Sequence, residues 1–248
     1  MRAVLTENLN KKIMSNTTLK NLQNLFDRWE KKMNKDEFGS FFRDGIECKH
    51  SEEYDNVQEE QERYNKWDNA TKKILFIAKD PNITNWGTSN GDQTKGASGF
   101  CDGNRRLDKY SKCRYLYITS FLEENKPEFD SIDMDKKHII EFFKDFPYAW
   151  LNIKKSGGGS ARIDAEIEKH LNDYGDLLLE EIEILKPDII ISLGSFYSPN
   201  IFNAPKLEEK LKEWKQAGKP ILYNAYHPSA VGRGRGYKKM YESLIKIS

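Results

Sequence analysis

The segment Asp188-Ile-Ile-Ile-Ser-Leu-Gly194 (DIIISLG) decides the fold that this sequence predicts. It is a short, nearly continuous apolar run that a glycine closes, and such a run is typical of a strand buried on both faces of a sheet. The residues on either side, 161–186 and 206–216, repeat their apolar side chains with the spacing of a helix. The segment therefore predicts one strand of a parallel sheet, with a helix before it and a helix after it.

Three more runs of the same kind lie along the chain: ILFIA (74–78), AWLNI (149–153) and ILYNAY (221–226). Each ends in Gly, Pro or polar residues, and helical patterns over 113–124, 134–146 and 237–247 separate or follow them. Strands that alternate with helices form parallel sheets, because each crossover helix packs back on the sheet. The sequence therefore predicts a three-layer αβα domain around a central, mostly parallel four-stranded sheet.

The first 70 residues follow a different pattern, dense in charge and mostly helical. Apolar side chains recur every three or four residues at Leu19, Leu22, Leu25, Phe26 and Trp29, which predicts an amphipathic helix that lies on another surface. A second apolar cluster follows at Phe38, Phe41, Phe42 and Ile46. We therefore predict that residues 1–70 form a helical extension packed on a main domain of residues 71–248.

Composition narrows the class of protein. The 248 residues carry 40 Lys and Arg against 39 Asp and Glu, so local clusters of cations would have to hold a nucleic-acid partner. The three cysteines form no C-x-x-C pair and the four histidines lack zinc spacing, so we expect neither a metal nor a cofactor. The first residues lack the apolar stretch of a signal peptide, and no apolar run reaches the roughly 18 residues of a membrane span. We expect a monomeric cytoplasmic protein with no membrane contact.

Polar side chains follow the predicted strands at the end where ligands bind in parallel sheets. Lys79-Asp80-Pro81-Asn82 comes after the first strand, and Asn152 lies at the end of the second, before Lys154, Lys155 and the loop Ser156-Gly-Gly-Gly-Ser160. His227-Pro228-Ser229 comes after the fourth strand, before the cationic loop Gly232-Arg-Gly-Arg-Gly236. A carboxylate, an amide, an imidazole and two glycine-rich loops are therefore expected at one edge of one sheet.

Each of these motifs also has an ordinary structural explanation. Asp80-Pro81 suits a turn, and a buried amide such as that of Asn152 often only satisfies the backbone. The glycine-rich loops suit flexible linkers, although the first also precedes a helix and could hold a phosphate on its backbone amides. His227 differs from the other histidines because a proline and then a cationic loop follow it. The order of the motifs along the chain is what points to a function.

In that order, the motifs resemble those of the uracil-DNA glycosylase superfamily. Asp80-Pro81 in ILFIAKDPN is similar to the family's Gly-Gln-Asp-Pro-Tyr-His motif, and Asn152 in AWLNIKK is similar to its base-reading Asn. Pro187-Asp-Ile-Ile-Ile-Ser-Leu-Gly194 resembles the family's third strand, and His227-Pro228-Ser229 resembles its last motif. The resemblance covers residues 72–248, and the first 70 residues lie outside it.

The resemblance implies a monofunctional DNA glycosylase, which hydrolyses the N-glycosidic bond of a flipped-out uracil or modified pyrimidine and leaves an abasic site. Positive charge builds on the sugar and negative charge on the leaving base as this bond breaks. Asp80 would orient a water and, as an anion, stabilise the sugar, and His227 would donate a hydrogen bond to the base carbonyl. The setting implied is base-excision repair or defence against modified foreign DNA.

The resemblance also implies a base pocket. Asn152 would read the base, and Phe100 or Trp86 would stack on it. Asn82 stands where the best-known branch of the family has a Tyr whose ring blocks 5-substituted bases. Because Asn82 is smaller and polar, we expect the pocket to accept a 5-substituted pyrimidine.

DNA is the expected partner, held at the same edge of the sheet. The loop after His227 would enter the DNA where the base leaves, with Val231 or Arg233 as the wedge. The other residues expected to contact DNA are Lys79, Lys154, Lys155, Gly157, Gly158, Ser229, Arg235 and Lys238.

Two other functions stay open. The same fold could hydrolyse free nucleosides or nucleotides, and cleavage of those substrates in preference to DNA would favour that function. The domain could also be a catalytically silent DNA-binding module, which an Asp80→Asn variant with undiminished function would favour. Asp80 argues against the silent module, because a carboxylate beside phosphates is unfavourable unless it has a task.

Overall fold

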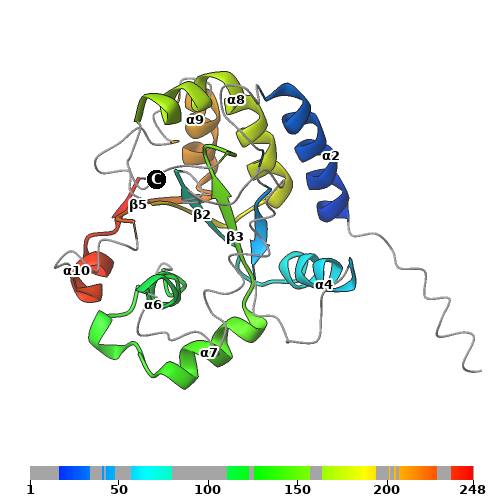
Figure 1. Cartoon of the computed structure of the whole chain (residues 1–248). Helices are drawn as coiled ribbons and strands as arrows, with labels where there is room; N and C mark the ends of the chain where they lie inside the picture. Colours follow the sequence, from blue (N-terminus) through cyan, green and yellow to red (C-terminus); the bar gives the residue numbers. More distant parts are fainter. Residues whose placement is uncertain are drawn as a thin grey trace, which may run out of the picture.

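A computed structural model describes residues 17–33, 41, 43–47, 57–79, 111–122, 126–156, 164–193, 201, 204, 207–227 and 236–247 of the chain. Within these residues a six-stranded sheet lies between two layers of helices (Figure 1). The predicted α/β class is confirmed in this three-layer arrangement. None of the helices in the described part of the chain is long and apolar enough to cross a membrane.

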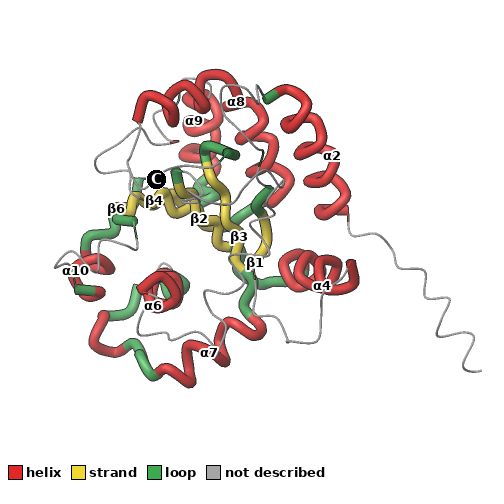
Figure 2. The backbone as a smooth tube through the Cα atoms, viewed as in Figure 1, coloured by secondary structure: helices red, strands yellow, loops and turns green. Residues whose placement is uncertain are grey.

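The four predicted strands form the parallel centre of the sheet. They are β2 (Ile74–Ala78), β3 (Tyr148–Asn152), β4 (Ile189–Leu193) and β5 (Ile221–Ala225), in the order β3-β2-β4-β5. All residues of β2, β3 and β4 are buried, because helices cover both faces (Figure 2). The continuous apolar runs in the sequence follow from this double burial.

Two short antiparallel strands extend the sheet at its edges, so the prediction of a four-stranded sheet is wrong. β1 (Gly45–Glu47) pairs with β3, and β6 (Ile245–Lys246) pairs with β5. Strands of three and two residues are too short to show an alternating pattern in the sequence. The sheet is therefore mixed, with six strands in the order β1-β3-β2-β4-β5-β6.

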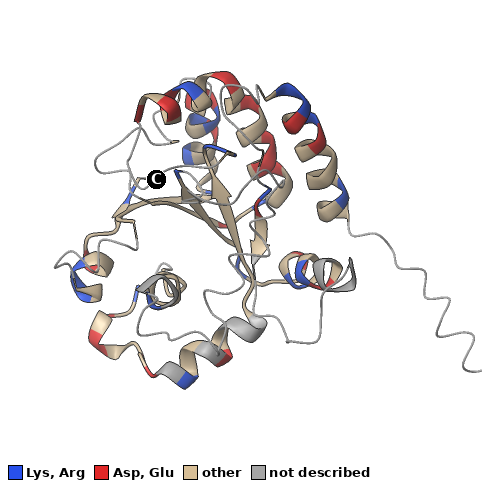
Figure 3. Ribbon diagram, viewed as in Figure 1, with Lys and Arg blue, Asp and Glu red and all other residues tan. Residues whose placement is uncertain are grey.

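The helices divide between the two faces of the sheet (Figure 1). One layer holds α2 (Thr17–Lys32), α8 (Asp164–Leu185) and α9 (Glu208–Ala217); the other holds α6 (Ser111–Thr119), α7 (Lys136–Asp145), α10 (Tyr237–Glu242) and the short 3-10 turn η3 (Phe129–Ser131). Charged side chains of both signs lie on these helices, and the strands between them are almost free of charge (Figure 3). Each layer encloses its own apolar core against one face of the sheet.

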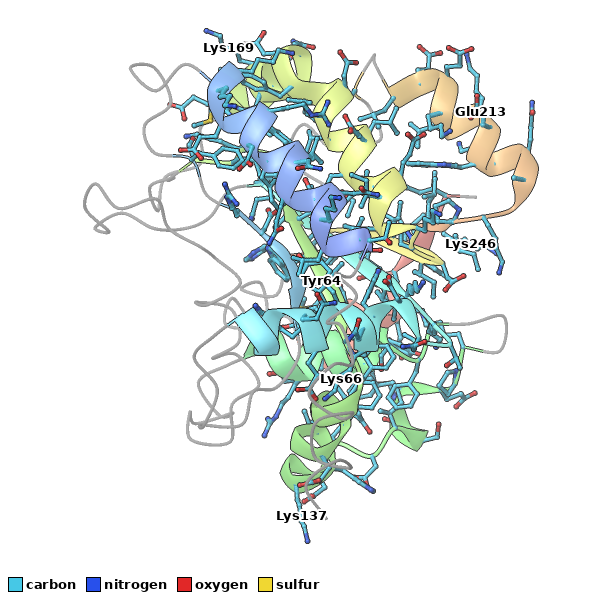
Figure 4. The ribbon with its side chains drawn as sticks, turned by 90° about the vertical axis from the view of Figure 1, so that its right-hand side faces the viewer. Tyr64, Lys66, Lys137, Lys169, Glu213 and Lys246 are labelled. Atoms are coloured by element: carbon cyan, nitrogen blue, oxygen red, sulfur yellow. The ribbon has the colours of Figure 1, made fainter. Side chains whose placement is uncertain are left out.

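The N-terminal segment contributes to the same core. The predicted amphipathic helix is α2, and its five apolar positions are all buried in the cluster that contains residues of α8. The helix α4 (Val57–Asp68) contacts α2 and β1, with Tyr64 on the side of α4 toward α2 and Lys66 on the opposite side (Figure 4). A division of the chain near residue 70 stays a prediction, since β1 and α2 share the sheet and core of the later elements.

The strand order creates a switch point at the carboxyl ends of β2 and β4. The chain passes from β2 to β3 on one side and then returns across β2 to β4 on the other. Connections that leave neighbouring strands in opposite directions open a crevice between them, and ligands of open α/β sheets bind there. Lys79, Asn152 and His227 lie at this carboxyl edge of the sheet.

Candidate active site

The carboxyl ends of β2 and β3 lie side by side. Ala78 is opposite Asn152 in the parallel register, and the amide of Ile153 donates to the carbonyl of Ala78 at 2.9 Å. The amide of Lys154 donates to the carbonyl of Lys79 at 2.8 Å, so the pairing continues past the end of both strands. Asn152 therefore lies beside Ala78 and next to the point where the chain leaves β2 at Lys79.

His227 lies at the same edge. It comes two residues after β5, which pairs with β4 through Leu193 and Ala225, and its side chain is half-buried. Three strand spacings separate β3 from β5, about 14 Å in all. Asn152 and His227 therefore lie at one edge of the sheet, on opposite sides of β2 and β4.

The side chain of Asn152 is buried and held by two defined partners. Its Oδ1 accepts a hydrogen bond from Nε1 of Trp150 at 3.3 Å, and its Nδ2 donates to Oδ2 of Asp44 at 3.2 Å. The backbone amide of Asn152 donates to the same Asp44 oxygen at 2.5 Å. Asp44 immediately precedes β1, so an edge strand from the N-terminal segment carries the group that orients Asn152.

Asp44 also belongs to a buried charged cluster with Lys155 and Glu181. Nζ of Lys155 pairs with Oδ1 of Asp44 and lies 2.7 Å from Oε2 of Glu181, and all three side chains are at most 2% exposed. The same ammonium lies over the rings of Trp29, at 5.2 Å, and Phe26, at 5.7 Å. Helix α2 therefore covers the cluster with two aromatic faces that favour a cation.

The buried cluster favours the neutral form of Glu181. Burial raises the pKa of Glu181 well above its ordinary value, and the carboxylate of Asp44 raises it further, while Lys155 opposes both effects. Two ionised carboxylates with one ammonium would leave a net charge inside the protein, which is costly. A neutral Glu181 beside the Asp44–Lys155 ion pair removes that charge.

Two other described histidines have ordinary environments. Burial lowers the pKa of His170 to about 3, with Lys154 and Lys155 adding to the effect, so its ring is neutral at physiological pH. That ring packs against Tyr174 with 4.8 Å between centroids. His138 is exposed and pairs with Asp133. His170 lies on α8 and His138 on α7, so neither directly follows a strand as His227 does.

The structure describes six of the predicted site residues, and three of them are lysines that pair with carboxylates. Lys155 is fully buried between two carboxylates, which does not fit the predicted phosphate contact, so we no longer assign it one. Lys154 pairs with Glu166 at 2.5 Å, and Lys238 pairs with Asp130, so their contacts with DNA stay predictions. The other three are Lys79, Asn152 and His227, all at the edge described above.

The remaining predicted site residues lie outside the described part of the chain. They are Asp80, Asn82, Trp86, Phe100, Gly157, Gly158, Ser229, Val231, Arg233 and Arg235. Within the described residues, no group of three or more His, Cys, Asp or Glu side chains could hold a metal ion.

The sequence reasoning missed three residues of this site: Asp44, Trp150 and Glu181. Only Glu181 left a visible signal, because it occupies an inward position between Leu178 and Leu185 on the apolar side of α8. A charged residue in such a stripe indicates a buried ionic partner. Asp44 and Trp150 carry no such pattern, since their role depends on the pairing of β1 with β3.

Comparison with known proteins finds a partial similarity. The type-4 uracil-DNA glycosylase of Archaeoglobus fulgidus is 34% identical to this chain over 90 residues, which are 33% of the chain and 43% of that protein. The chain thus spans less than half of the length of this relative. No family model matches the chain, and no solved structure matches it. The similarity supports a uracil-DNA glycosylase-like relationship over a third of the chain.

Proposed function

We propose that this protein is a DNA glycosylase that hydrolyses the N-glycosidic bond of a flipped-out uracil or modified pyrimidine and leaves an abasic site. The observation that carries the proposal is the shared carboxyl edge of β2, β3 and β5, from which residues 80, 152 and 227 follow. The partial similarity to a type-4 uracil-DNA glycosylase supports the same reaction. The proposed partner is DNA, bound by a monomer.

In the proposed reaction, the charges that develop on the substrate determine the task of each residue. Asp80 orients the attacking water and, as a carboxylate, stabilises the positive charge that builds on the sugar. His227 donates a hydrogen bond to the carbonyl oxygen of the base, where negative charge gathers as the bond breaks. Asn152 hydrogen-bonds the edge of the base and holds it in position for cleavage.

Base flipping requires contacts on both sides of the extruded nucleotide. We assign the side beyond β5 to the loop from Ser229 to Arg235, with Val231 or Arg233 in the space that the base leaves. Lys79 and the glycines at 157 and 158 are assigned to phosphates on the side of β2 and β3. In this proposal the cations at 79, 233 and 235 act together at one edge, which would allow DNA binding by a chain with a net charge of only +1.

The preferred substrate is expected to include 5-substituted pyrimidines. Asn82 follows the Asp-Pro pair, and its small polar side chain leaves more room at carbon 5 of the base than a tyrosine ring would. A protein that removes such bases would act in base-excision repair or against modified foreign DNA.

The substrate is tested with oligonucleotides that carry one defined base each. We expect alkali-labile abasic sites at uracil or at 5-substituted pyrimidines, measured in single- and double-stranded DNA at enzyme excess. Excision of uracil with no excision of any 5-substituted pyrimidine would overturn the role given to Asn82. Cleavage of free nucleosides or nucleotides in preference to DNA would replace the proposal with a nucleotide hydrolase.

A further inference from the structure

The Asn152 carboxamide has two ends with opposite chemistry, and its neighbours determine which end lies where. A carboxamide oxygen only accepts hydrogen bonds, and its nitrogen only donates them. Nε1 of Trp150 can only donate, and it contacts Oδ1 of Asn152 at 3.3 Å. Asp44 contacts Nδ2 at 3.2 Å. Both contacts therefore require the same orientation of the amide.

Asp44 offers carboxylate oxygens to the donors around it, as this orientation needs. Its Oδ1 is paired with the ammonium of Lys155, and its Oδ2 accepts hydrogen bonds from both the backbone and the side chain of Asn152. The ammonium, the backbone amide and the carboxamide nitrogen all donate to Asp44, so its oxygens act as acceptors toward Asn152. Burial raises the pKa of the neighbouring Glu181.

We propose that Asp44 and Trp150 are positioning residues that fix the orientation of Asn152 and thereby make the site select a base with a carbonyl at carbon 4 over cytosine. This inference rests on the proposed function. A 4-carbonyl pyrimidine presents a carbonyl acceptor at carbon 4 and an N–H donor at nitrogen 3, which match the nitrogen and the oxygen of one amide. Cytosine presents an amino donor and a ring acceptor at those places, the reverse pattern.

The selection against cytosine is strong because reversing the Asn152 carboxamide costs free energy. A reversed Asn152 would place its oxygen against the carboxylate of Asp44 and its nitrogen against the N–H of Trp150. Both contacts would then be between like groups in a buried site, where unsatisfied polar atoms are expensive. Asn152 alone could read either base; with these two neighbours it reads one.

The location of Asp44 gives the N-terminal segment a task in base selection. Asp44 immediately precedes β1, and the antiparallel pairing of Gly45 with Trp150 brings it beside β3. The motifs that resemble glycosylases begin near residue 72, so this contribution comes from outside them. Helix α2 supports it by covering Lys155, the cation that holds Asp44.

The test compares the excision rates of uracil and cytosine in otherwise identical oligonucleotides for three variants. Asp44→Asn offers Asn152 a donor as well as an acceptor, and Trp150→Phe removes the Nε1 donor while keeping an aromatic ring. We expect each to lower the ratio of the uracil rate to the cytosine rate by about tenfold or more. Trp67→Phe is the matched control, because it also removes a buried indole donor, which here bonds the carbonyl of Leu185, and it should leave the ratio unchanged.

The outcomes separate this inference from the proposed function. A merely structural role of Asp44 or Trp150 would change stability, or slow both excisions together, and leave the ratio intact. If the wild type excises uracil and the folded variants keep its ratio, the inference fails and the proposed function stands. If the wild type excises no base, both fail. Trp150→Phe decides the matter alone if Asp44→Asn does not fold, because it leaves the ion pair of Lys155 in place.

Discussion

At the scale of the residue, the central feature is a charged cluster in the interior. Asp44, Lys155 and Glu181 come from the residue before β1, the segment after β3 and helix α8, and each is at most 2% exposed. Removing the cation from such a cluster leaves a buried carboxylate without compensation, which typically costs about 3–5 kcal/mol. The cluster therefore ties three separate elements together beside Asn152.

The first prediction concerns Lys155. Lys155→Met should lower the free energy of unfolding by about 3–5 kcal/mol, because Asp44 would lose its buried cation. The matched control is Lys212→Met, which breaks an exposed pair with Glu208 on α9 and should cost about 0.5 kcal/mol or less. Urea unfolding of both variants measures the difference. Equal effects of the two substitutions would contradict the role of Lys155.

The second prediction concerns the pH dependence of stability. The pKa of Glu181 is raised in the folded protein, so folding takes up a proton. The contribution of Glu181 to stability is fully present below the pKa that a glutamate has in the unfolded chain, about 4.3. It is lost as the pH rises through the pKa of Glu181 in the folded protein. Glu181→Gln removes this dependence.

Urea unfolding at pH 5 and pH 8 measures this pH dependence of the unfolding free energy. The wild type should lose stability relative to Glu181→Gln between these two values, since glutamine mimics the neutral carboxyl at both. A difference in unfolding free energy that stays constant across this range would show that Glu181 is ionised in the folded protein.

At the scale of the element, the N-terminal helix behaves as part of the domain. The side chains of Leu22, Leu25 and Trp29 on α2 are fully buried in the same core as α8. Arg28 on α2 also pairs with Glu180 on α8. A helix that covers this much apolar surface should unfold together with the sheet.

The third prediction tests that cooperativity. Leu22→Ala should lower the free energy of unfolding by about 2–5 kcal/mol, the usual cost of a cavity in a core. Lys20→Ala, on the exposed side of the same helix, should have little effect. The unfolding transition followed by circular dichroism should stay single in both variants. A separate early transition in Leu22→Ala would mean that α2 is an independent appendage.

The sequence predicted the elements that are long and apolar, and missed those that depend on partners. The four central strands have five residues each and are continuous apolar runs, so their positions were predicted to within a residue or two. β6 was predicted as the end of a helix over 237–247, but α10 ends at Glu242. A two-residue edge strand depends on hydrogen bonds to β5, and no local pattern encodes that pairing.

At the scale of the whole molecule, the candidate site follows from the strand order. Lys79, Asn152 and His227, each more than 70 residues from the next, come to one edge because β2 and β3 are parallel neighbours and β4 brings β5 alongside. That convergence could be predicted from the alternation of strands and helices. The neighbours of Asn152 could not, because Asp44 reaches it only through an edge strand that was not recognised.

The final prediction concerns the central claim, that this protein hydrolyses an N-glycosidic bond in DNA. The most direct measurement is the single-turnover rate of abasic-site formation at uracil or a 5-substituted pyrimidine. It compares the wild type with Asp80→Asn at equal, saturating DNA binding. We expect the wild type to form abasic sites and the variant to do so at least about a hundredfold more slowly, because an amide cannot stabilise the sugar cation as a carboxylate does. Undiminished excision by Asp80→Asn, or no abasic site at any base with the wild type, would contradict the account.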